Sequence, residues 1–525
     1  MASLALILHA HLPFVRHPEH PDFLEETWLY EAITESYLPL LNVLDGLVRD
    51  GVPFALTLSL TPTLCSMLRD PLLMERYARY LEAALALAGR EVLRDPATAE
   101  QARFYEGRLS ACREWFFQRW QGDLVRAFAG FAERGVLEII TCAATHGFLP
   151  LMEPSPEALR AQILVARDHY RDCFGRDPEG IWLPECGYAA GLEKTLAEAN
   201  LRWFVTDAHG LLFGTPRPRY AIYAPCFTPA GPAVFGRDRE SSRQVWSAQE
   251  GYPGDPAYRD FYRDIGFDLP HEALAGFLPP GAPRRFTGLK YHRITGPGPG
   301  AQKALYERAP ALEAVERHAA HFVEARARQF AALPGTIEPI IVAPFDAELF
   351  GHWWFEGPEF LDRVIRKAAG QAHAFTLATP GKHLARHPRQ QMLLPSASSW
   401  GHKGYWEVWL DEANAWIYPH LHAAARRMTE MANRYRDEPP PAPVAETLRQ
   451  MARELLLAQA SDWAFLMKTG TASEYATART REHLLRFTRL YEGLRRGAVD
   501  EAFLAHCQWR DNLFPNLDWR HYLSA

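Results

Sequence analysis

The stretch LALILHAH (residues 4–11) decides how the rest of the chain is interpreted. Residues 4–8 are all apolar, as in a strand that is buried on both faces of a parallel sheet, and the run ends in His9 and His11. Side chains two positions apart on a strand point to the same side. In a parallel barrel the carboxyl ends of the strands carry the functional groups, so this run predicts a first barrel strand with two imidazoles at its functional end.

Six further apolar runs have the same form, and helical patterns such as residues 157–175 and 311–333 lie between them. The runs are FALTLSLTP (54–62), VLEIITCAATH (136–146), GIWLPE (180–185), LRWFVTD (201–207), EPIIVAPFD (338–346) and HAFTLATP (373–380). Alternating strands and helices predict an α/β fold with a parallel sheet covered on both faces. About seven strands favour a barrel over an open doubly wound sheet, and the chain has no G-x-G-x-x-G or Walker-type loop of the kind that nucleotide-binding open sheets carry.

Two regions interrupt this alternation with nearly continuous helical patterns. We predict a barrel from residues 1–70 and 136–395, a helical insertion at 71–135 and a C-terminal helical domain at 396–525. Segment 214–300 is rich in glycine, proline and aromatic residues. It is too long for a simple connection, and long irregular segments in compact domains are often functional.

The composition excludes several classes of protein. The chain has 525 residues, of which 48% are hydrophobic and 23% charged, and its net charge is -6, so we expect no nucleic-acid partner. No apolar run approaches the roughly 20 residues of a membrane span, and the N-terminus lacks the basic leader of a signal peptide. Seven scattered cysteines, none in a C-x-x-C pair, fit a reducing compartment. We expect a cytoplasmic monomer with no membrane partner.

The ionisable residues that end the predicted strands are the candidates for catalysis. They are His9, His11, His146, Glu185, Asp207 and Asp346. Glu185 and Asp346 each follow a strand, with a proline and several aromatic residues nearby. Two carboxyl groups across a cleft are what glycosidic bond cleavage requires, since one protonates the leaving oxygen and the other attacks the anomeric carbon or activates a water. For each acid alone, an arginine-paired structural carboxylate is the alternative.

Aromatic residues favour a sugar ligand. The chain has 15 tryptophans, and they cluster at 353–354 and within 400–416. Flat aromatic rings bind the apolar faces of pyranoses, while the hydroxyl groups need polar partners. Trp400 lies in a Gly/Ser-rich loop and is the better ligand contact. Trp409 and Trp416 are seven positions apart, so packing inside the helical domain explains them equally well.

The histidines also permit a metal interpretation. An H-x-H pair at the end of a first strand, with a later aspartate such as Asp207, resembles the zinc sites of some barrel deacetylases and mannosidases. Imidazoles can equally bond sugar hydroxyls. We predict no metal and no cofactor.

Five motifs in order resemble glycoside hydrolase family 57. They are HAHLPF (9–14), ITCAATHGFLP (140–150), WLPECGY (182–188), FDAELFGHWW (345–354) and SDWAFLMKTG (461–470). The resemblance covers essentially the whole chain. Stretches 245–269 and 288–296 are similar to the 1,4-α-glucan branching subgroup of that family.

The resemblance implies a distorted (β/α)7 barrel, with a helical insertion and a C-terminal α-helical domain that contributes to the glucan cleft. It implies a retaining, metal-free mechanism on α-1,4-glucans such as amylose, amylopectin and glycogen, with Glu185 as nucleophile and Asp346 as acid/base. The substrate-binding residues that it implies are His9, His11, Trp28, His146, Asp207, Trp246, Trp400, Trp409, Asp462 and Trp463.

One departure bears on the reaction outcome. For a branching member of the family, the resemblance implies a tyrosine-bearing loop that closes over the site. The matching stretch here, residues 229–246, has no tyrosine. This departure keeps open an α-glucan hydrolase, and a 4-α-glucanotransferase with the same active site is a further alternative. The histidines with Asp207 keep open a metal-dependent deacetylase or mannosidase, and the tryptophan clusters a glucan-binding scaffold without catalysis.

Overall fold

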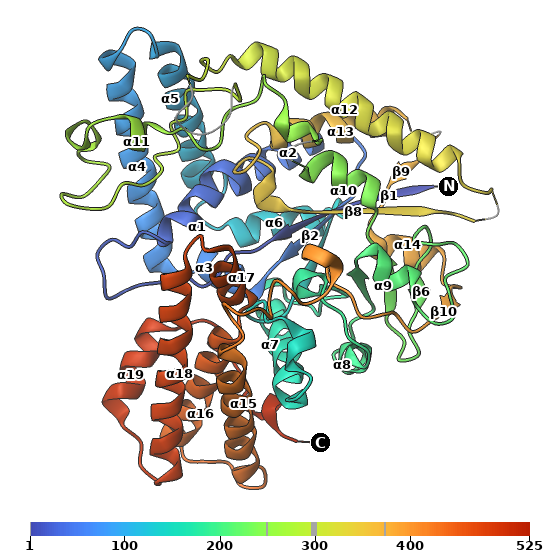
Figure 1. Ribbon diagram of the computed structural model, residues 1–525, viewed down its shortest axis with the longest axis vertical. Helices are drawn as coiled ribbons and strands as arrows, with labels where there is room; N and C mark the ends of the chain where they lie inside the picture. The colour runs from blue at the N-terminus through green and yellow to red at the C-terminus, as the bar shows by residue number, and fades with distance from the viewer. Residues whose placement is uncertain (1, 248–249, 296–301, 336, 372–373, 525) are drawn as a thin grey trace.

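Seven parallel strands form the centre of the computed structural model, which describes all residues except 1, 248–249, 296–301, 336, 372–373 and 525 (Figure 1). In sheet order they are β8 (Ile340–Asp346), β1 (Ser3–Ala10), β2 (Leu56–Leu60), β3 (Leu137–Cys142), β4 (Gly180–Trp182), β5 (Trp203–Thr206) and β7 (Ala233–Gly236). Just beyond β7, Arg237 forms a parallel bridge with Val342 of β8, and the Asp238 amide donates to the Val342 carbonyl (2.8 Å). The two ends of the sheet therefore meet, which confirms the distorted barrel.

The seventh barrel strand is not the one that the sequence pattern predicted. The run at 373–380 contributes only β9 (Thr376–Leu377), which pairs with the start of β1 outside the seven-stranded order, and residue 373 lies outside the described part. The barrel instead uses β7, which lies inside the segment that we expected to be irregular. Four residues between Pro232 and Arg237 are too few to show an alternating pattern.

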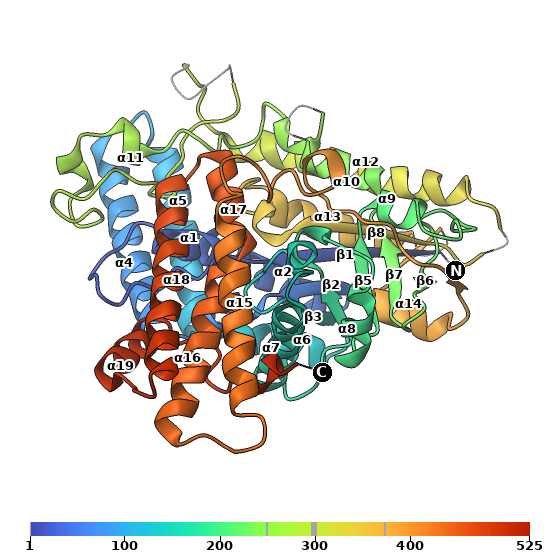
Figure 2. The ribbon, with the colours of Figure 1, turned by 60° about the horizontal axis from the view of Figure 1, so that its bottom comes forward.

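Helices cover the outside of the barrel, where each buries its apolar face against the sheet or a neighbouring helix (Figures 1 and 2). They are α1 (Glu26–Ala32), α2 (Leu38–Arg49), α3 (Pro62–Leu68), α6 (Leu124–Glu133), α7 (Pro156–Phe174), α8 (Leu192–Glu198), α9 (Ala208–Leu212), α10 (Arg239–Trp246), α12 (Arg308–Ala331), α13 (Gly357–Gly370) and α14 (Pro380–Arg386). Short strands β6 (Cys226–Phe227) and β10 (Gln391–Met392) extend the sheet beyond β7.

Two groups of helices stand apart from the sheet. Helices α4 (Pro71–Arg94) and α5 (Ala99–Glu114) pair with each other, and α11 (Ile265–Asp268) lies beside them (Figures 1 and 2). The second group is α15 (Ile417–Arg434), α16 (Ala442–Ala458), α17 (Ser461–Thr469), α18 (Ser473–Arg495) and α19 (Glu501–Arg510). This C-terminal helical region is part of the predicted fold class and is confirmed. The exact boundaries at residues 70, 135 and 395 stay predictions.

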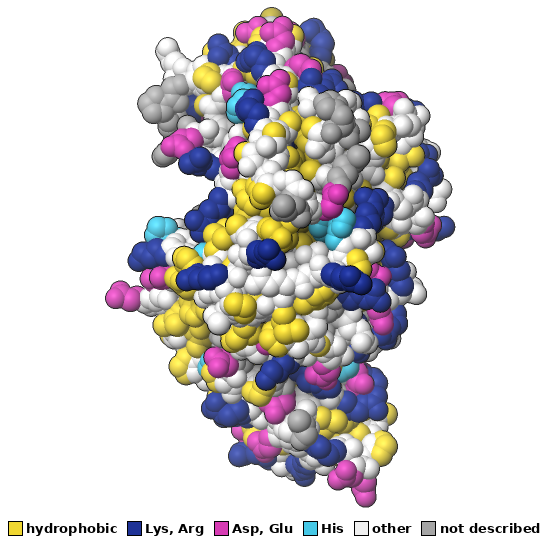
Figure 3. All heavy atoms as spheres, turned by 90° about the vertical axis from the view of Figure 1, so that its right-hand side faces the viewer, with side chains coloured by type: hydrophobic (Ala, Val, Ile, Leu, Met, Phe, Trp, Pro, Cys, Tyr) yellow, Lys and Arg dark blue, Asp and Glu magenta, His cyan; other side chains and the backbone are white. Residues whose placement is uncertain are grey.

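Local signals in the sequence explain where several helices begin. Thr61 and Asp70 precede α3 and α4, and each side chain accepts a hydrogen bond from a backbone amide of the first turn. Both helices also have proline at their first position, where the missing amide hydrogen costs nothing. No helix in the described ranges is long and apolar enough to cross a membrane. On the face shown in Figure 3, acidic and basic side chains are interspersed with apolar ones.

Candidate active site

The carboxyl ends of the barrel strands bring most of the predicted residues together. In the register of the sheet, His9 of β1 lies beside Ser59 of β2 on one side and Asp346 of β8 on the other. Glu185 follows β4 in a short turn, and His146 follows β3. This arrangement follows from the fold, because all strands of a parallel barrel end at the same face.

Three histidines form a stacked and hydrogen-bonded group. His9 Nε2 lies 3.0 Å from His146 Nε2, and His9 Nδ1 lies 3.0 Å from Ser59 Oγ. His11 stacks on His146 with ring centroids 3.9 Å apart. Its Nε2 lies 3.1 Å from both carboxylate oxygens of Asp462, the second residue of α17. The C-terminal helical region therefore contributes directly to this site.

The pKa values of the three imidazoles shift in different directions because their surroundings differ. Burial and the charge of His11 lower the pKa of His9 well below its usual value, and burial lowers the pKa of His146 in the same way. Burial also disfavours the charged form of His11, but the charge and hydrogen bond of Asp462 outweigh it and raise the pKa of His11. His11 is thus the imidazole of this group whose protonated form the surroundings favour, and the charge of Glu185 adds to that effect.

Glu185 is held by donors from two distant parts of the chain. Trp400 Nε1 donates to Glu185 Oε2 (2.7 Å), and Ser461 Oγ donates to Oε1 (3.2 Å). The Trp400 amide also donates to the Glu185 carbonyl (2.9 Å), which fixes the loop against the turn after β4. Burial raises the pKa of Glu185 to about 7, while the Trp400 hydrogen bond and the charge of His11 favour the ionised form.

The backbone is strained at Glu185 and at His146. Glu185 has φ 62° and ψ 21°, and His146 has φ 58°, both in the left-handed region that non-glycine residues rarely adopt. Such residues cost about 1–3 kcal/mol each and concentrate at functional sites. Here the strain aims both side chains at the mouth of the barrel.

Asp346 has a different environment from Glu185. Burial raises its pKa well above the usual value, and the charges of Glu348 and Glu185 raise it further, against an opposing effect of Arg237. Its carboxyl group receives no hydrogen bond from any residue that the structure describes. Since the charge of Glu185 contributes to the pKa shift of Asp346, the two carboxyl groups are close enough to interact electrostatically. The hydrogen bonds to Glu185 therefore favour its ionised form, whereas burial and the acidic neighbours of Asp346 favour its protonated form.

Four further residues at the site were not predicted from the sequence. Glu348 Oε1 accepts from the His11 amide (3.1 Å) and from the Tyr37 hydroxyl (2.5 Å), and Ser461 lies 2.8 Å from His146 Nδ1. Glu348 and Ser461 are within two positions of predicted residues, so their motifs contained the signal. Arg237 could not be found, because it follows the strand that the pattern missed.

Asp207 lies in a hollow beside Trp400 and not in the histidine group. His209 Nδ1 lies 2.9 Å from Asp207 Oδ1, and Arg237 lies 3.5 Å from Oδ2. The hollow has a volume of about 390 Å³. It is lined by Asp207, His209, Phe213, Arg239, Ser399, Trp400, Gly401, Lys403, Gly404 and Tyr405. Aromatic rings beside charged and hydroxyl groups suit a sugar ligand.

Two predicted glucan contacts do not fit their placement. Trp409 and Trp463 are 1% and 0% exposed. Trp409 stacks on Phe148 with ring centroids 4.4 Å apart, and Trp463 Nε1 donates to the Leu457 carbonyl (2.7 Å). Both rings therefore pack inside the protein, which for Trp409 is the alternative that its helical spacing indicates.

Two other predicted contacts lie at the surface or near it. Trp28 is half-buried and meets Tyr475 of α18 edge-on at 5.8 Å. Trp246 is the exposed last residue of α10. Residues 229–246 contain β7 and α10, joined only by Arg237 and Asp238, so this stretch forms no long loop after β7.

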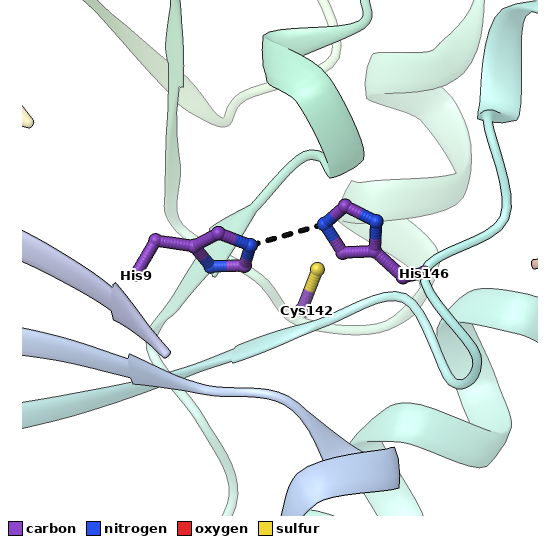
Figure 4. Close-up of side chains that lie close together, drawn as sticks. All are labelled: His9, Cys142 and His146. Atoms are coloured by element: carbon purple, nitrogen blue, oxygen red, sulfur yellow. Dashed lines mark hydrogen bonds between the residues drawn. The ribbon is translucent and has the colours of Figure 1, made fainter. Parts of the chain in front are cut away.

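Two groups of side chains at the site have the spacing of metal ligands. One is His9, Cys142 and His146 (Figure 4), and the other is His11, His146 and Asp462, with ligand atoms within 4.8 Å of one another. The Nε2 atoms of His9 and His146 face each other, and Cys142 lies beneath them. Asp207 belongs to neither group, contrary to the metal interpretation of the sequence. Hydrogen bonds to Ser59, Ser461 and each other hold the imidazoles in place.

Comparisons with known proteins identify the family of this chain. The sequence profile of glycosyl hydrolase family 57 matches residues 5–398, and that of the C-terminal part of 1,4-alpha-glucan branching enzymes matches residues 420–522. A 1,4-alpha-glucan branching enzyme of Thermococcus kodakarensis, TK1436, is 34% identical over 99% of this chain and 78% of its own.

Two solved structures share the fold over the whole chain. The alpha-amylase AmyC from Thermotoga maritima is 43% identical, with a TM-score of 0.92, and the match covers 100% of this chain and 99% of that one. The branching enzyme of Pyrococcus horikoshii is 34% identical, with a TM-score of 0.88 over 100% and 97% of the two chains. The chain therefore belongs to glycosyl hydrolase family 57, and its C-terminal part matches that of 1,4-alpha-glucan branching enzymes.

Proposed function

We propose that the protein is a 1,4-α-glucan branching enzyme that cleaves an α-1,4-glucan and transfers the chain to a 6-hydroxyl with retention. The observation that carries this proposal is the contrast between two partly buried carboxyl groups at one end of the barrel. Glu185 receives two hydrogen bonds that favour its ionised form, whereas burial and acidic neighbours raise the pKa of Asp346. A retaining reaction needs this division between an ionised nucleophile and a protonated acid.

In the first half of the reaction Asp346 gives its proton to the glycosidic oxygen, and a Glu185 oxygen forms a bond to the anomeric carbon. The leaving chain departs with a new hydroxyl group, and a glucosyl ester remains on Glu185. The donors Trp400 and Ser461 stabilise the ionised carboxylate before attack, and so does His11, whose protonated form Asp462 favours. In the second half Asp346 removes the proton of the acceptor hydroxyl, which attacks the same carbon and releases Glu185.

The acceptor decides the product. A glucan 6-hydroxyl gives an α-1,6 branch, a 4-hydroxyl gives a lengthened chain, and water gives hydrolysis. The chemistry is nearly the same in all three, so exclusion of water and positioning of the acceptor select among them. The hollow beside Trp400 is adjacent to Glu185 and is the candidate place for acceptor sugars.

Hydrolysis is the second candidate, and two observations favour it. Only Arg237 and Asp238 separate β7 from α10, so residues 229–246 provide no closing loop of the kind that the family resemblance implies for branching members. AmyC, at 43% identity, is described as an alpha-amylase.

Incubation with unbranched amylose distinguishes the candidates. Reducing ends and α-1,6 linkages are followed together, the latter by proton NMR and by chain release with a debranching enzyme. We expect α-1,6 linkages to form faster than reducing ends. Reducing ends that rise without any α-1,6 linkage would eliminate branching in favour of hydrolysis. A redistribution of α-1,4 chain lengths, with neither signal rising, would indicate a 4-α-glucanotransferase.

The Trp400→Phe variant tests how Glu185 is kept ionised. We expect kcat/KM on amylose to fall about 10- to 150-fold, since a hydrogen bond to a charged group contributes about 1.5–3 kcal/mol. The nucleophile must be ionised and its pKa is about 7, so the wild-type rate should fall below neutral pH. Loss of the donor raises that pKa further, so the acid limb of the variant should move to higher pH. Trp406→Phe is the control, and an unmoved acid limb in Trp400→Phe would contradict the assignment.

A further inference from the structure

Five aromatic rings form a connected surface cluster beside the barrel mouth, outside the catalytic residues. We call Phe261, Tyr262, Phe267, Phe286 and Trp353 the aromatic platform. Phe261 stacks on Trp353 with ring centroids 4.7 Å apart and contacts Phe286 at 5.7 Å and Tyr262 at 5.2 Å. Phe267 meets Phe286 edge-on at 5.3 Å. The rings come from segments 261–267 and 286 and from the loop after β8.

The platform exposes more aromatic surface than folding requires. Tyr262 is 63% exposed, Trp353 54% and Phe267 50%. Single exposed apolar residues are ordinary, but a contiguous exposed aromatic patch marks a binding surface. The ion pair of Arg263 with Asp268 (3.0 Å) flanks the rings with the kind of polar groups that sugar hydroxyls need.

Buried charges hold the platform rigidly from below. Lys290 is buried with its Nζ 4.1 Å from the ring centre of Phe261 and 4.3 Å from that of Phe286. Asp264 accepts hydrogen bonds from the amide and hydroxyl of Thr287, at 3.0 and 2.7 Å, which ties the two segments together. A surface whose rings are already ordered loses little conformational entropy when a ligand binds.

The loop that carries Trp353 is anchored to the helix containing Glu35. His352 Nδ1 lies 2.6 Å from Glu35 Oε2, and the other carboxylate oxygen of Glu35 lies 3.5 Å from Arg259 Nη1. Gly351 has φ 115°, and a side chain there would collide with the Glu35 carbonyl, since a Cβ atom would lie 1.8 Å from it. Only glycine permits this close approach, so the position of Trp353 is determined by the fold.

Hydrogen bonds through Glu348 link the platform to the catalytic site. The Trp353 amide donates to the Glu348 carbonyl (3.2 Å), and the Glu348 carboxylate accepts from the His11 amide (3.1 Å). Trp353 is also only seven positions after Asp346, on the segment that leaves β8 at the mouth of the barrel. A glucan chain that extends from the catalytic residues along this segment would reach the rings.

We infer that the aromatic platform is a second binding site for an α-1,4-glucan chain, which holds polymeric substrate through ring stacking next to the catalytic cleft. The identity of the ligand rests on the proposed function. The inference accounts for residues 261–267 and 286–290, which no step of the reaction uses. It also predicts that the platform matters for long chains and not for short ones, because a short oligosaccharide occupies the catalytic cleft alone.

The test is the double variant Tyr262→Ala/Trp353→Ala, with Trp509→Ala as the matched control. Trp509 is a 47% exposed tryptophan on α19, outside the platform. Binding is measured by retardation in native gels that contain amylopectin, in a Glu185→Gln background so that turnover does not alter the matrix. KM and kcat are measured in the active background on amylose and on maltoheptaose. Thermal unfolding and gel filtration check the fold and the oligomeric state.

We expect the double variant to bind amylopectin about 10-fold more weakly and to raise KM for amylose by a similar factor, as the loss of two stacking contacts implies. Its kcat, and both constants for maltoheptaose, should stay within about twofold of wild type, and Trp353→Phe should restore part of the binding. Three results would each overturn the inference. They are unchanged retardation by amylopectin, an equal loss of kcat/KM on maltoheptaose, and a change of oligomeric state, which would show that the rings contact a second copy of the chain. Retardation is independent of linkage, so a wild type that forms no α-1,6 bonds would overturn only the proposed function.

Discussion

The Glu185→Gly variant should lose on the order of 10⁴-fold or more in kcat/KM on amylose, because it removes the covalent step of the reaction. Added azide should then restore turnover of an α-maltosyl fluoride donor. Azide would occupy the space of the missing carboxylate and attack the anomeric carbon from the same face. The product should be the β-glycosyl azide, of inverted configuration, which NMR identifies.

The same substitution should not weaken the fold. Glu185 has φ 62°, which glycine adopts without strain, and its side chain is partly buried. We expect the midpoint of thermal unfolding to stay equal or to rise, so loss of activity cannot be attributed to unfolding. Glu185→Gln is the control that keeps the shape of the side chain and should be equally inactive without rescue by azide. Activity within 10-fold of wild type in either variant would exclude Glu185 as the nucleophile.

The Asp346→Asn variant should lose about 10²- to 10⁴-fold on amylose, the usual contribution of a general acid/base. A glycosyl fluoride has a leaving group that needs no proton, so formation of the glucosyl ester should stay fast with this donor. Breakdown of the ester should be slow, because the acceptor has lost its base. Mass spectrometry should therefore detect an accumulated glucosyl enzyme, and azide should release the α-glycosyl azide, of retained configuration.

The stereochemistry of the two azide products separates the two roles. We expect a glycosyl azide of inverted configuration from Glu185→Gly and one of retained configuration from Asp346→Asn. This pair of results would assign the nucleophile and the acid/base without reference to rates. Glu348→Gln is the matched control, since Glu348 is a buried acid two positions from Asp346 that contacts the His11 amide and Tyr37. If Glu348→Gln accumulated the ester and Asp346→Asn did not, Glu348 would be the acid/base instead.

Much of the fold was predictable because its strands are long and apolar. The runs at 4–11, 136–146 and 338–346 contain buried strands of six to eight residues, whose pattern is clear. The run at 373–380 has the same appearance but supplies only two paired residues. The true seventh strand has four residues after a turn, and only its pairing with β5 and the bridge to Val342 identify it. Short strands are specified by their neighbours more than by their own sequence.

The sequence by itself determined which chemical groups lie at the barrel mouth, because strand ends in a parallel barrel must face one side. Only the tertiary structure decided what those groups can do. Asp462, 451 positions from His11, favours the protonated form of that imidazole, and Ser461, 276 positions from Glu185, donates to its carboxylate. Burial makes Trp409 and Trp463 core residues, whereas Trp400 becomes a donor to Glu185. Charge and exposure depend on atoms that are close in space and distant in the chain, and a linear pattern does not contain those distances.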